Sequence, residues 1–197
     1  MGYTAIIISA GLSSRMGEFK PLLDIGGKPA IIRLLDTIRA AGIEDVVVVT
    51  GYKHELLEEA LSCLVYNADY ESGMFSSVQA GVKYAADKGD ALLFLVDVPL
   101  VSAETISGLM RAYEKNGDSC FAIPVYKEKN GHPLLIPRVC YKEILDHKGE
   151  GGLKEIRGRH CAEMLRYEVD DEGCVLDMDT PEDYERLLSY YGGADDE

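Results

Sequence analysis

The first apolar run of the chain stands in the segment Thr4-Ala-Ile-Ile-Ile-Ser-Ala-Gly-Leu-Ser-Ser-Arg-Met-Gly-Glu-Phe-Lys-Pro-Leu-Leu23, which continues as a polar loop. β-Branched residues dominate positions 5–8, which is typical of a strand buried on both faces of a parallel sheet. Gly11 follows, and a residue without a side chain lets the backbone approach a ligand closely. Arg15 and Lys20 add positive charge where backbone N–H groups already favour an anion. The segment therefore predicts a phosphate-binding loop after the first strand.

Two better-known phosphate-binding motifs do not fit this loop. A P-loop has four residues between its glycines and then Lys-Ser/Thr, whereas here five residues separate Gly11 from Gly17 and Glu18 follows. The dinucleotide motif G-x-G-x-x-G fails because Ser13 stands at the second glycine position. The remaining alternative is a surface turn that carries two solvated cations.

The composition is that of a globular protein of one domain. The chain has 197 residues, of which 47% are hydrophobic and 27% charged. Its net charge of −14 repels phosphate polymers, so no nucleic-acid partner is expected and the positive charge of the first loop is local. We assign residues 1–191 to the domain and residues 192–197 to an acidic flexible tail.

The cysteines and the N-terminal sequence indicate a cytoplasmic protein without a membrane partner. The first residues lack the basic leader of a secretion signal, and their apolar run is too short to cross a membrane. An odd number of widely spaced cysteines without a C-x-x-C pair argues against a disulfide framework or a zinc site. We expect free thiols at the five positions Cys63, Cys120, Cys140, Cys161 and Cys174.

Short apolar runs alternate with segments of helical period, which predicts an α/β fold with a mostly parallel sheet. The carboxyl ends of such strands share one edge, where open α/β sheets bind ligands. Strands are expected at residues 5–8, 46–49, 63–66, 91–96, 119–124, 131–137 and 163–169, with a polar loop at 127–130. Helices are expected at residues 29–42, 54–61, 74–86, 102–115, 139–145 and 152–157, and after the N-cap Thr180.

Two aspartates are candidate ligands of Mg²⁺. Asp97 follows six apolar residues, and a carboxylate there must face water, a cation or a helix N-terminus because burying it unpaired is costly. Asp179 precedes the final helix and is not needed to cap it, although Asp177 is close enough to take its place. Mg²⁺ takes only one or two carboxylates and completes its shell with phosphate oxygens and water. The alternative for Asp97 is a strand-end acid that caps the next helix.

Ser77 and His132 are candidate ligand contacts outside the first loop. Ser77 belongs to a turn that runs into a helix, and hydroxyls there can donate to a ligand, although an N-cap serine without a ligand explains it equally well. His132 lies in a Gly-His-Pro tripeptide within a polar loop, and an imidazole can donate to a phosphate or another acceptor atom of a ligand, although a lone histidine is more often structural. The other histidines, His54, His147 and His160, are expected to be surface or packing residues.

The first loop resembles a known family. Its sequence Ala10-Gly-Leu-Ser-Ser-Arg-Met-Gly-Glu-Phe-Lys20 is similar to the A-G-x-S-x-R-M-G-x-x-K signature of molybdenum cofactor nucleotidyltransferases. The resemblance implies a Rossmann-like three-layer sandwich of the nucleotide-diphospho-sugar transferase type. It also implies Mg²⁺ on Asp97 and Asp179, catalytic roles for Arg15, Lys20 and Asp97, and an acceptor site at His132 and Lys154. The residues it implies for nucleotide binding are Ser9, Ala10, Gly11, Ser13, Arg15, Lys20, Ser77 and Asp97.

The resemblance further implies transfer of a nucleoside monophosphate to molybdopterin with release of pyrophosphate. Ala10 stands where the guanylyl branch has a second glycine, which favours CTP over GTP. The segment 148–156 departs from the family pattern, since Lys154 replaces an arginine and cannot make bidentate contacts to phosphate. The family also implies a transient contact with a molybdoenzyme or its chaperone. Alternatives are a GTP-using enzyme, a nucleotidyltransferase acting on a sugar or another small phosphate, and a non-catalytic nucleotide-binding maturation partner.

Overall fold

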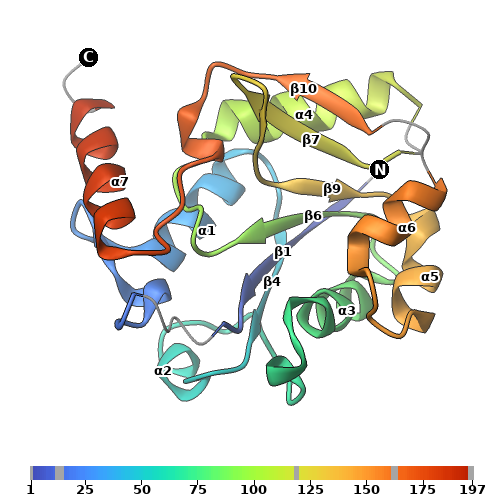
Figure 1. Ribbon diagram of the computed structural model, residues 1–197, viewed down its shortest axis with the longest axis horizontal. Helices are drawn as coiled ribbons and strands as arrows, with labels where there is room; N and C mark the ends of the chain where they lie inside the picture. Colours follow the sequence, from blue (N-terminus) through green and yellow to red (C-terminus); the bar gives the residue numbers. More distant parts are fainter. Residues whose placement is uncertain (1, 12–15, 118–119, 161–163, 195–197) are drawn as a thin grey trace.

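A computed structural model of the chain describes residues 2–11, 16–117, 120–160 and 164–194. Its centre is a sheet of strand order β10-β7-β9-β6-β1-β4-β5, with β8 paired to β7 (Figure 1). Pairing is parallel between β1 and both β4 and β6, between β4 and β5, and between β7 and β10, which confirms the mostly parallel sheet. The strands are β1 (Tyr3–Ser9), β4 (Asp45–Thr50), β5 (Leu64–Tyr66), β6 (Asp90–Leu95), β7 (Ala122–Tyr126), β8 (Lys129–Asn130), β9 (Leu134–Ile136) and β10 (Leu165–Glu168).

The second half of the chain departs from parallel pairing. β9 runs antiparallel to β6 and β7, and β8 pairs antiparallel with the end of β7. The polar loop predicted at residues 127–130 is shorter in the structure, because β8 takes up Lys129–Asn130. Lys127 and Glu128 form the tight turn of the hairpin and lie in the left-handed region at φ 45° and 67°.

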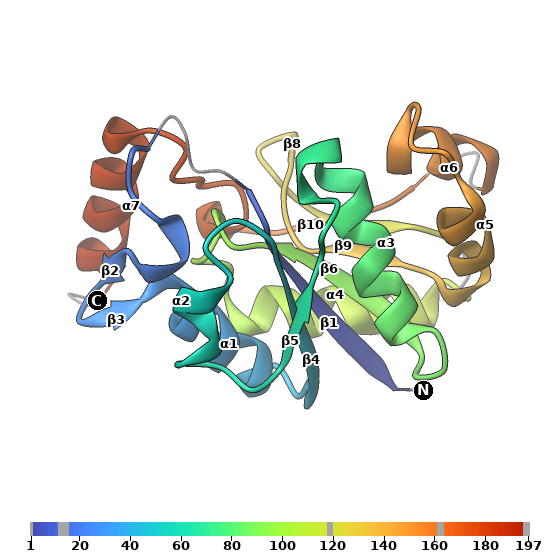
Figure 2. The same cartoon turned by 90° about the horizontal axis from the view of Figure 1, so that it is seen from below.

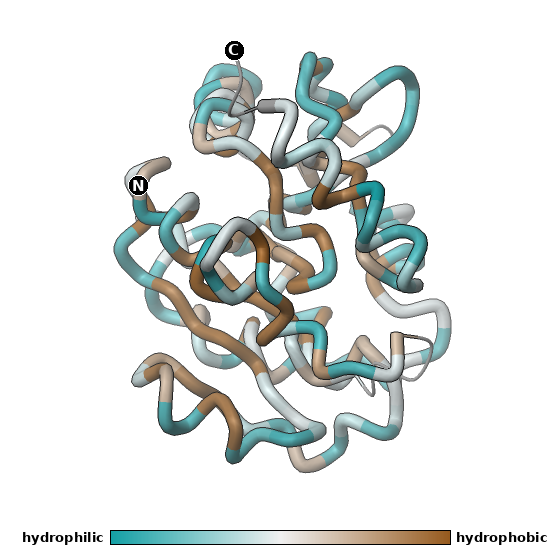
Figure 3. Tube along the Cα trace, turned by 90° about the vertical axis from the view of Figure 1, so that its left-hand side faces the viewer, coloured by the Kyte–Doolittle hydropathy of each residue, from teal (hydrophilic) through white to brown (hydrophobic). Residues whose placement is uncertain are grey.

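Helices cover both faces of the sheet, which explains why the central strands are apolar throughout. Along β1 the side chain of Ile7 packs in the cluster that includes α1 and α4, whereas Ile6 and Ile8 pack in the cluster that includes α3, α5 and α6. Figure 2 shows the two helical layers, and Figure 3 shows the hydrophobic strands running between polar loops. The helices are α1 (Ala30–Ala40), α2 (Glu55–Glu58), α3 (Met74–Ala85), α4 (Ala103–Lys115), α5 (Tyr141–Asp146), α6 (Gly152–His160) and α7 (Pro181–Ala194).

A glycine sets the distance between α3 and β1. A Cβ atom at Gly81 would lie 2.3 Å from Cγ2 of Ile6, well inside van der Waals contact. The absence of that atom lets α3 pack directly against the central strand. The N-terminal end of α3 is thereby held close to the carboxyl edge of the sheet.

α7 packs beside a hairpin that the sequence did not predict, formed by β2 (Asp24–Ile25) and β3 (Lys28–Pro29) (Figure 2). The helix and the hairpin share a small apolar cluster that includes Ile25, Met178 and Leu187. Thr180 is the predicted N-cap: its Oγ1 accepts from the backbone N–H of Asp183 at 3.2 Å. The helix continues to Ala194, within the segment assigned above to the tail.

The structure also bears on the predicted helix at 54–61, on the cysteines and on membrane-spanning segments. The predicted helix at 54–61 is shorter, since α2 spans only Glu55–Glu58. The cysteines at positions 63, 120, 140 and 174 are thiols and not part of a disulfide, as expected, and Cys161 lies outside the described residues. Over the described part of the chain, no helix combines the length and the apolar character needed to span a membrane.

Candidate active site

The site begins where two neighbouring strands end. β1 and β6 pair in parallel, and the pairing continues past the end of β6, because the N–H of Val96 donates to the carbonyl of Ile8 at 3.1 Å. Asp97 therefore lies beside Ser9 and the loop that follows β1. This is the sheet edge where the sequence predicts a phosphate-binding loop.

A long-range backbone contact brings the second acidic segment to the same point. The N–H of Met178 donates to the carbonyl of Asp97 at 3.0 Å, and the Met178 side chain is fully buried in the cluster beneath α7. Asp177 and Asp179 flank this anchor. The structure thus brings both predicted acids, and the alternative Asp177, to the end of β6.

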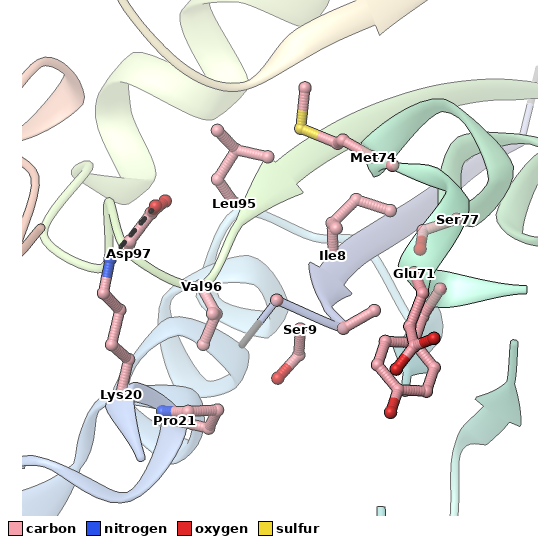
Figure 4. Close-up of a pocket in the computed structure, with 14 residues that line it drawn as sticks. Ile8, Ser9, Lys20, Pro21, Glu71, Met74, Ser77, Leu95, Val96 and Asp97 are labelled. Carbon is pink, nitrogen blue, oxygen red and sulfur yellow. Dashed lines mark ion pairs between the residues drawn. The ribbon is translucent and has the colours of Figure 1, made fainter. Parts of the chain in front are cut away.

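Lys20 reaches both of these acids from the N-terminal loop. Its Nζ lies 2.6 Å from Oδ1 of Asp179 and 3.8 Å from Oδ2 of Asp97. The Lys20 side chain is only 12% exposed, so its charge is poorly solvated and depends on these two partners. The contact with Asp97 is drawn in Figure 4.

Two cavities meet at Asp97. The β1–α3 cavity has a volume of about 360 Å³ and is lined by Ile8, Ser9, Ala10, Gly11, Lys20, Pro21, Tyr70, Glu71, Gly73, Met74, Ser77, Leu95, Val96 and Asp97 (Figure 4). The acidic cavity has a volume of about 250 Å³ and is lined by Leu95, Asp97, Val98, Asn130, His132, Cys174, Val175, Asp177 and Asp179. Lys20 lines the first cavity and Asp179 the second, so their ion pair lies at the junction.

The surroundings of Asp97 fit a divalent cation. Burial raises the pKa of this carboxyl, Lys20 opposes the rise, and the charges of Asp179 and Asp177 add to it. One of its oxygens, Oδ1, is buried without a hydrogen-bond partner among the described residues. A hard cation would satisfy such an oxygen. Among the described residues, no three His, Cys, Asp or Glu side chains are placed so that they could hold one metal ion together, so a cation would need phosphate oxygens and water as further ligands.

Ser77 is held by a residue that the sequence analysis did not single out. Nδ2 of Asn67 donates to the hydroxyls of Ser77 at 3.0 Å and of Ser76 at 2.9 Å. Because the Ser77 oxygen accepts this bond, its proton is the part that can reach a ligand in the β1–α3 cavity. Asn67 comes directly after β5, and a polar residue at a strand end was the signal that could have found it.

His132 lines the acidic cavity as a neutral imidazole. Burial lowers the pKa of its ring, while a hydrogen bond to the backbone carbonyl of Leu93 opposes that shift. Nδ1 is buried without a partner in the described structure, so the proton that bonds Leu93 is on Nε2. His132 therefore offers this cavity a lone pair, whereas the sequence analysis considered it as a donor.

Three predicted site residues are not placed in these cavities. Ser13 and Arg15 lie outside the described residues, so their predicted contacts with the triphosphate are neither supported nor opposed. Lys154 is exposed on α6 and lines neither cavity.

The remaining histidines have packing or surface roles, as expected. His54 bonds Thr50 at 2.6 Å, and His160 pairs with Glu143. His147 accepts from the N–H of Gly149 at 3.0 Å and its ring meets that of Phe75 edge-on.

The turn before α3 and the first residue of this helix supply three lining residues that the sequence patterns did not single out: Tyr70, Glu71 and Met74. Tyr70 packs against the end of β4, where a Cβ on Gly51 would lie 2.5 Å from Cβ of Tyr70. A side chain at position 51 would thus displace Tyr70 from the cavity wall. Met74 is 59% exposed and lines the cavity, so its apolar side chain is accessible to a ligand there.

An open, mostly parallel sheet with a cavity, a lysine and two carboxylates at its carboxyl edge defines an α/β protein that binds its ligand at that edge. Residues 5–164 match the MobA-like NTP transferase domain, and the chain belongs to this family of nucleotidyltransferases, as the first loop suggested. This membership supports a nucleoside triphosphate as substrate.

Similar proteins include the molybdenum cofactor cytidylyltransferase of Escherichia coli K12, 27% identical over 91% of this chain and 92% of that protein. The bifunctional protein GlmU of Pseudoalteromonas atlantica is 31% identical over 60% of this chain but only 27% of its own length. Among solved structures, Rv0371c of Mycobacterium tuberculosis has a TM-score of 0.78 at 24% identity, covering 96% of this chain and 98% of that one. CMP:2-keto-3-deoxy-manno-octonic acid synthetase, solved with CTP, has a TM-score of 0.77 at 13% identity, covering 98% and 100%. These structures confirm the predicted fold.

Proposed function

We propose that the chain transfers a nucleoside monophosphate, preferably CMP, from a nucleoside triphosphate to a phosphate of a molybdopterin-type acceptor. The observation that carries this proposal is the meeting of Lys20, Asp97 and Asp179 at the junction of two cavities. Two substrates in adjoining cavities could react at this junction. The near full-length similarity to a molybdenum cofactor cytidylyltransferase supports the choice of base and acceptor.

In the reaction, an oxygen of the acceptor phosphate attacks the α-phosphorus of the triphosphate. A new P–O bond forms while the bond between the α-phosphorus and the bridging oxygen breaks, and pyrophosphate leaves with the electron pair. The attacking oxygen is already anionic, so no general base is required. The rate must come from alignment and from neutralising charge. Lys20 neutralises the leaving pyrophosphate, and we expect Arg15 to share this role.

Asp97 and Asp179 would hold Mg²⁺. When bound, the cation neutralises phosphate charge that the acidic protein would otherwise repel. The buried, unpartnered oxygen of Asp97 supports this assignment. Further support comes from Rv0371c, a protein of the same fold that has been solved in complex with manganese.

Each cavity would bind one of the two substrates. The β1–α3 cavity suits the nucleotide, because its small residues Ser9, Ala10 and Gly11 admit phosphates and Ser77 can donate to the ribose or base. The acidic cavity suits the acceptor, whose N–H or O–H groups His132 would accept through Nδ1. Asp97 borders both, where the phosphates of the two substrates must come together.

The test is pyrophosphate release from CTP and GTP with Mg²⁺ and a panel of acceptors that includes molybdopterin and a sugar 1-phosphate. We expect the highest kcat/KM for CTP with molybdopterin, and its loss in Asp97→Asn but not in the exposed control Asp36→Asn. Preference for GTP or for the sugar phosphate would replace the proposed substrates. Nucleotide binding without pyrophosphate release from any acceptor would refute an enzymatic role and favour a maturation partner.

A further inference from the structure

The Lys20 ion pair crosses the boundary between the two cavities. Lys20 lines the β1–α3 cavity, Asp179 lines the acidic cavity, and Asp97 lines both. The ammonium group lies 2.6 Å from one carboxylate and 3.8 Å from the other. In Figure 4 the Lys20 side chain extends along the cavity wall toward Asp97. One cation thus bridges the two acids assigned above to a metal ion.

The two carboxylates lie in surroundings that favour a nearby cation. No other Lys or Arg is among the described residues that line either cavity. The carboxylates of Asp97 and Asp179 are 28% and 29% exposed, so water screens their charges only in part. Their mutual repulsion favours a nearby cation, and Lys20 pairs with both of them.

We propose that Lys20 is the resident counter-ion of the Asp97–Asp179 pair, and that the nucleoside triphosphate frees the pair for a divalent cation by drawing Lys20 onto its phosphates. The inference rests on the proposed function, since it takes the same two acids as the metal ligands. Metal binding then depends on the nucleotide, because the free protein holds an ammonium group where the metal would bind. Lys20 thereby acts first on the carboxylates and afterwards on the substrate.

In the nucleotide-free protein, the positive charge of Lys20 should weaken the binding of a divalent cation. Removing the Lys20 charge should allow a divalent cation to bind without any nucleotide. Unit charges about 4 Å apart interact strongly at the intermediate dielectric of a partly buried site, so the gain in affinity should be at least about tenfold. A lysine that acts only on phosphates would give no such gain.

The experiment is a titration of the nucleotide-free protein with Mn²⁺, followed by the electron paramagnetic resonance signal of the free ion. We expect Lys20→Met to bind Mn²⁺ at least about tenfold more tightly than the wild type. Lys28→Met is the matched control, since Lys28 forms an ion pair of 2.7 Å with Asp36 at the surface and its loss changes the net charge equally. The double variant Lys20→Met/Asp97→Asn should lose the gain.

An unchanged Mn²⁺ affinity in Lys20→Met, or a gain that survives in the double variant, would overturn the inference. If circular dichroism shows that Lys20→Met does not fold, Lys20→Gln is the second neutral variant and carries the same expectation. The same measurements distinguish this inference from the proposed function. If the protein releases pyrophosphate in an Asp97-dependent way but Lys20→Met binds Mn²⁺ no more tightly than the wild type, only the counter-ion role of Lys20 is rejected. If Lys20→Met gains Mn²⁺ affinity but the wild type releases no pyrophosphate with any acceptor, only the catalytic proposal is rejected.

Discussion

The β1–α3 cavity and the acidic cavity share Asp97 but differ in almost everything else. The first is walled by small and apolar residues such as Ala10, Pro21 and Met74, with Lys20 as its described cation. The second contains three aspartates and a neutral histidine. Under the proposed function, a flat base would lie against the apolar wall, whereas an acceptor phosphate near the acids would need a cation between them. The difference between the cavities therefore leads us to propose that the nucleotide is recognised mainly by shape and the acceptor by charge compensation.

The largest effect is expected at the residue that both cavities share. Asp97→Asn keeps the size of the side chain but removes its charge, and we expect kcat to fall by about 10²–10³-fold, as when a preorganised electrostatic group is lost. Pyrophosphate release with saturating substrates is the measurement. A loss below about tenfold in a folded variant would show that Asp97 does not hold the reacting groups.

The acidic cavity offers two candidates for the second metal ligand, and substitution can separate them. Asp179 contacts Lys20, whereas Oδ1 of Asp177 accepts from the N–H of Asp179 at 3.2 Å, as expected of a residue that shapes the turn. We expect Asp179→Asn to lower kcat/KM by about 10–100-fold at limiting Mg²⁺, and Asp177→Asn by less than about fivefold. The reverse order would move the metal ligand to Asp177.

A pair of variants should act on one substrate each. Ser77→Ala should raise the KM for CTP by about fivefold and leave that for the acceptor unchanged, since one hydrogen bond is lost. His132→Ala should raise the KM for the acceptor and leave the KM for CTP unchanged. His132→Asn should restore acceptor binding, because its amide oxygen can replace the lone pair of Nδ1. If either variant changes both KM values equally, the division of the cavities is wrong.

The smallest effect concerns the dependence of stability on pH. The pKa of Asp97 is raised in the folded state, chiefly by burial, so at neutral pH the charged carboxylate opposes folding, and this penalty disappears as the pH falls through the raised pKa. We expect Asp97→Asn to have a Tm about 2 °C above that of the wild type at pH 7, with the difference shrinking toward acidic pH. Calorimetry across this range checks it. A lower Tm at pH 7 would mean that the Lys20 ion pair outweighs the cost of burial.

The two halves of the molecule were not equally predictable. β1, β4 and β6 are buried on both faces, so their apolar runs alone identified them. β9 has the same kind of apolar run, but a run does not encode direction, and its antiparallel pairing depends on contacts across the sheet. α2 is short because Leu57 is its one buried residue, which is too little apolar surface to extend the helix.

The same limit applies to the site. Residue type and position at strand ends were enough to single out Lys20, Asp97 and Asp179. Their meeting depends on the bond from Met178 to Asp97, which joins residues 81 positions apart and has no local signature. Asn67 carries a local signal, since it directly follows β5, but its bond to Ser77 appears only when β5 and α3 are placed together.

The anchor at Met178 ties the acidic pair to the packing of the C-terminal helix. Met178 bonds the backbone of Asp97 and also packs with Ile25 and Leu187 in the cluster between α7 and its hairpin. None of these three residues lines either cavity. A substitution in this small cluster that shifts α7 would therefore also shift Asp179 relative to Lys20, without touching a cavity wall.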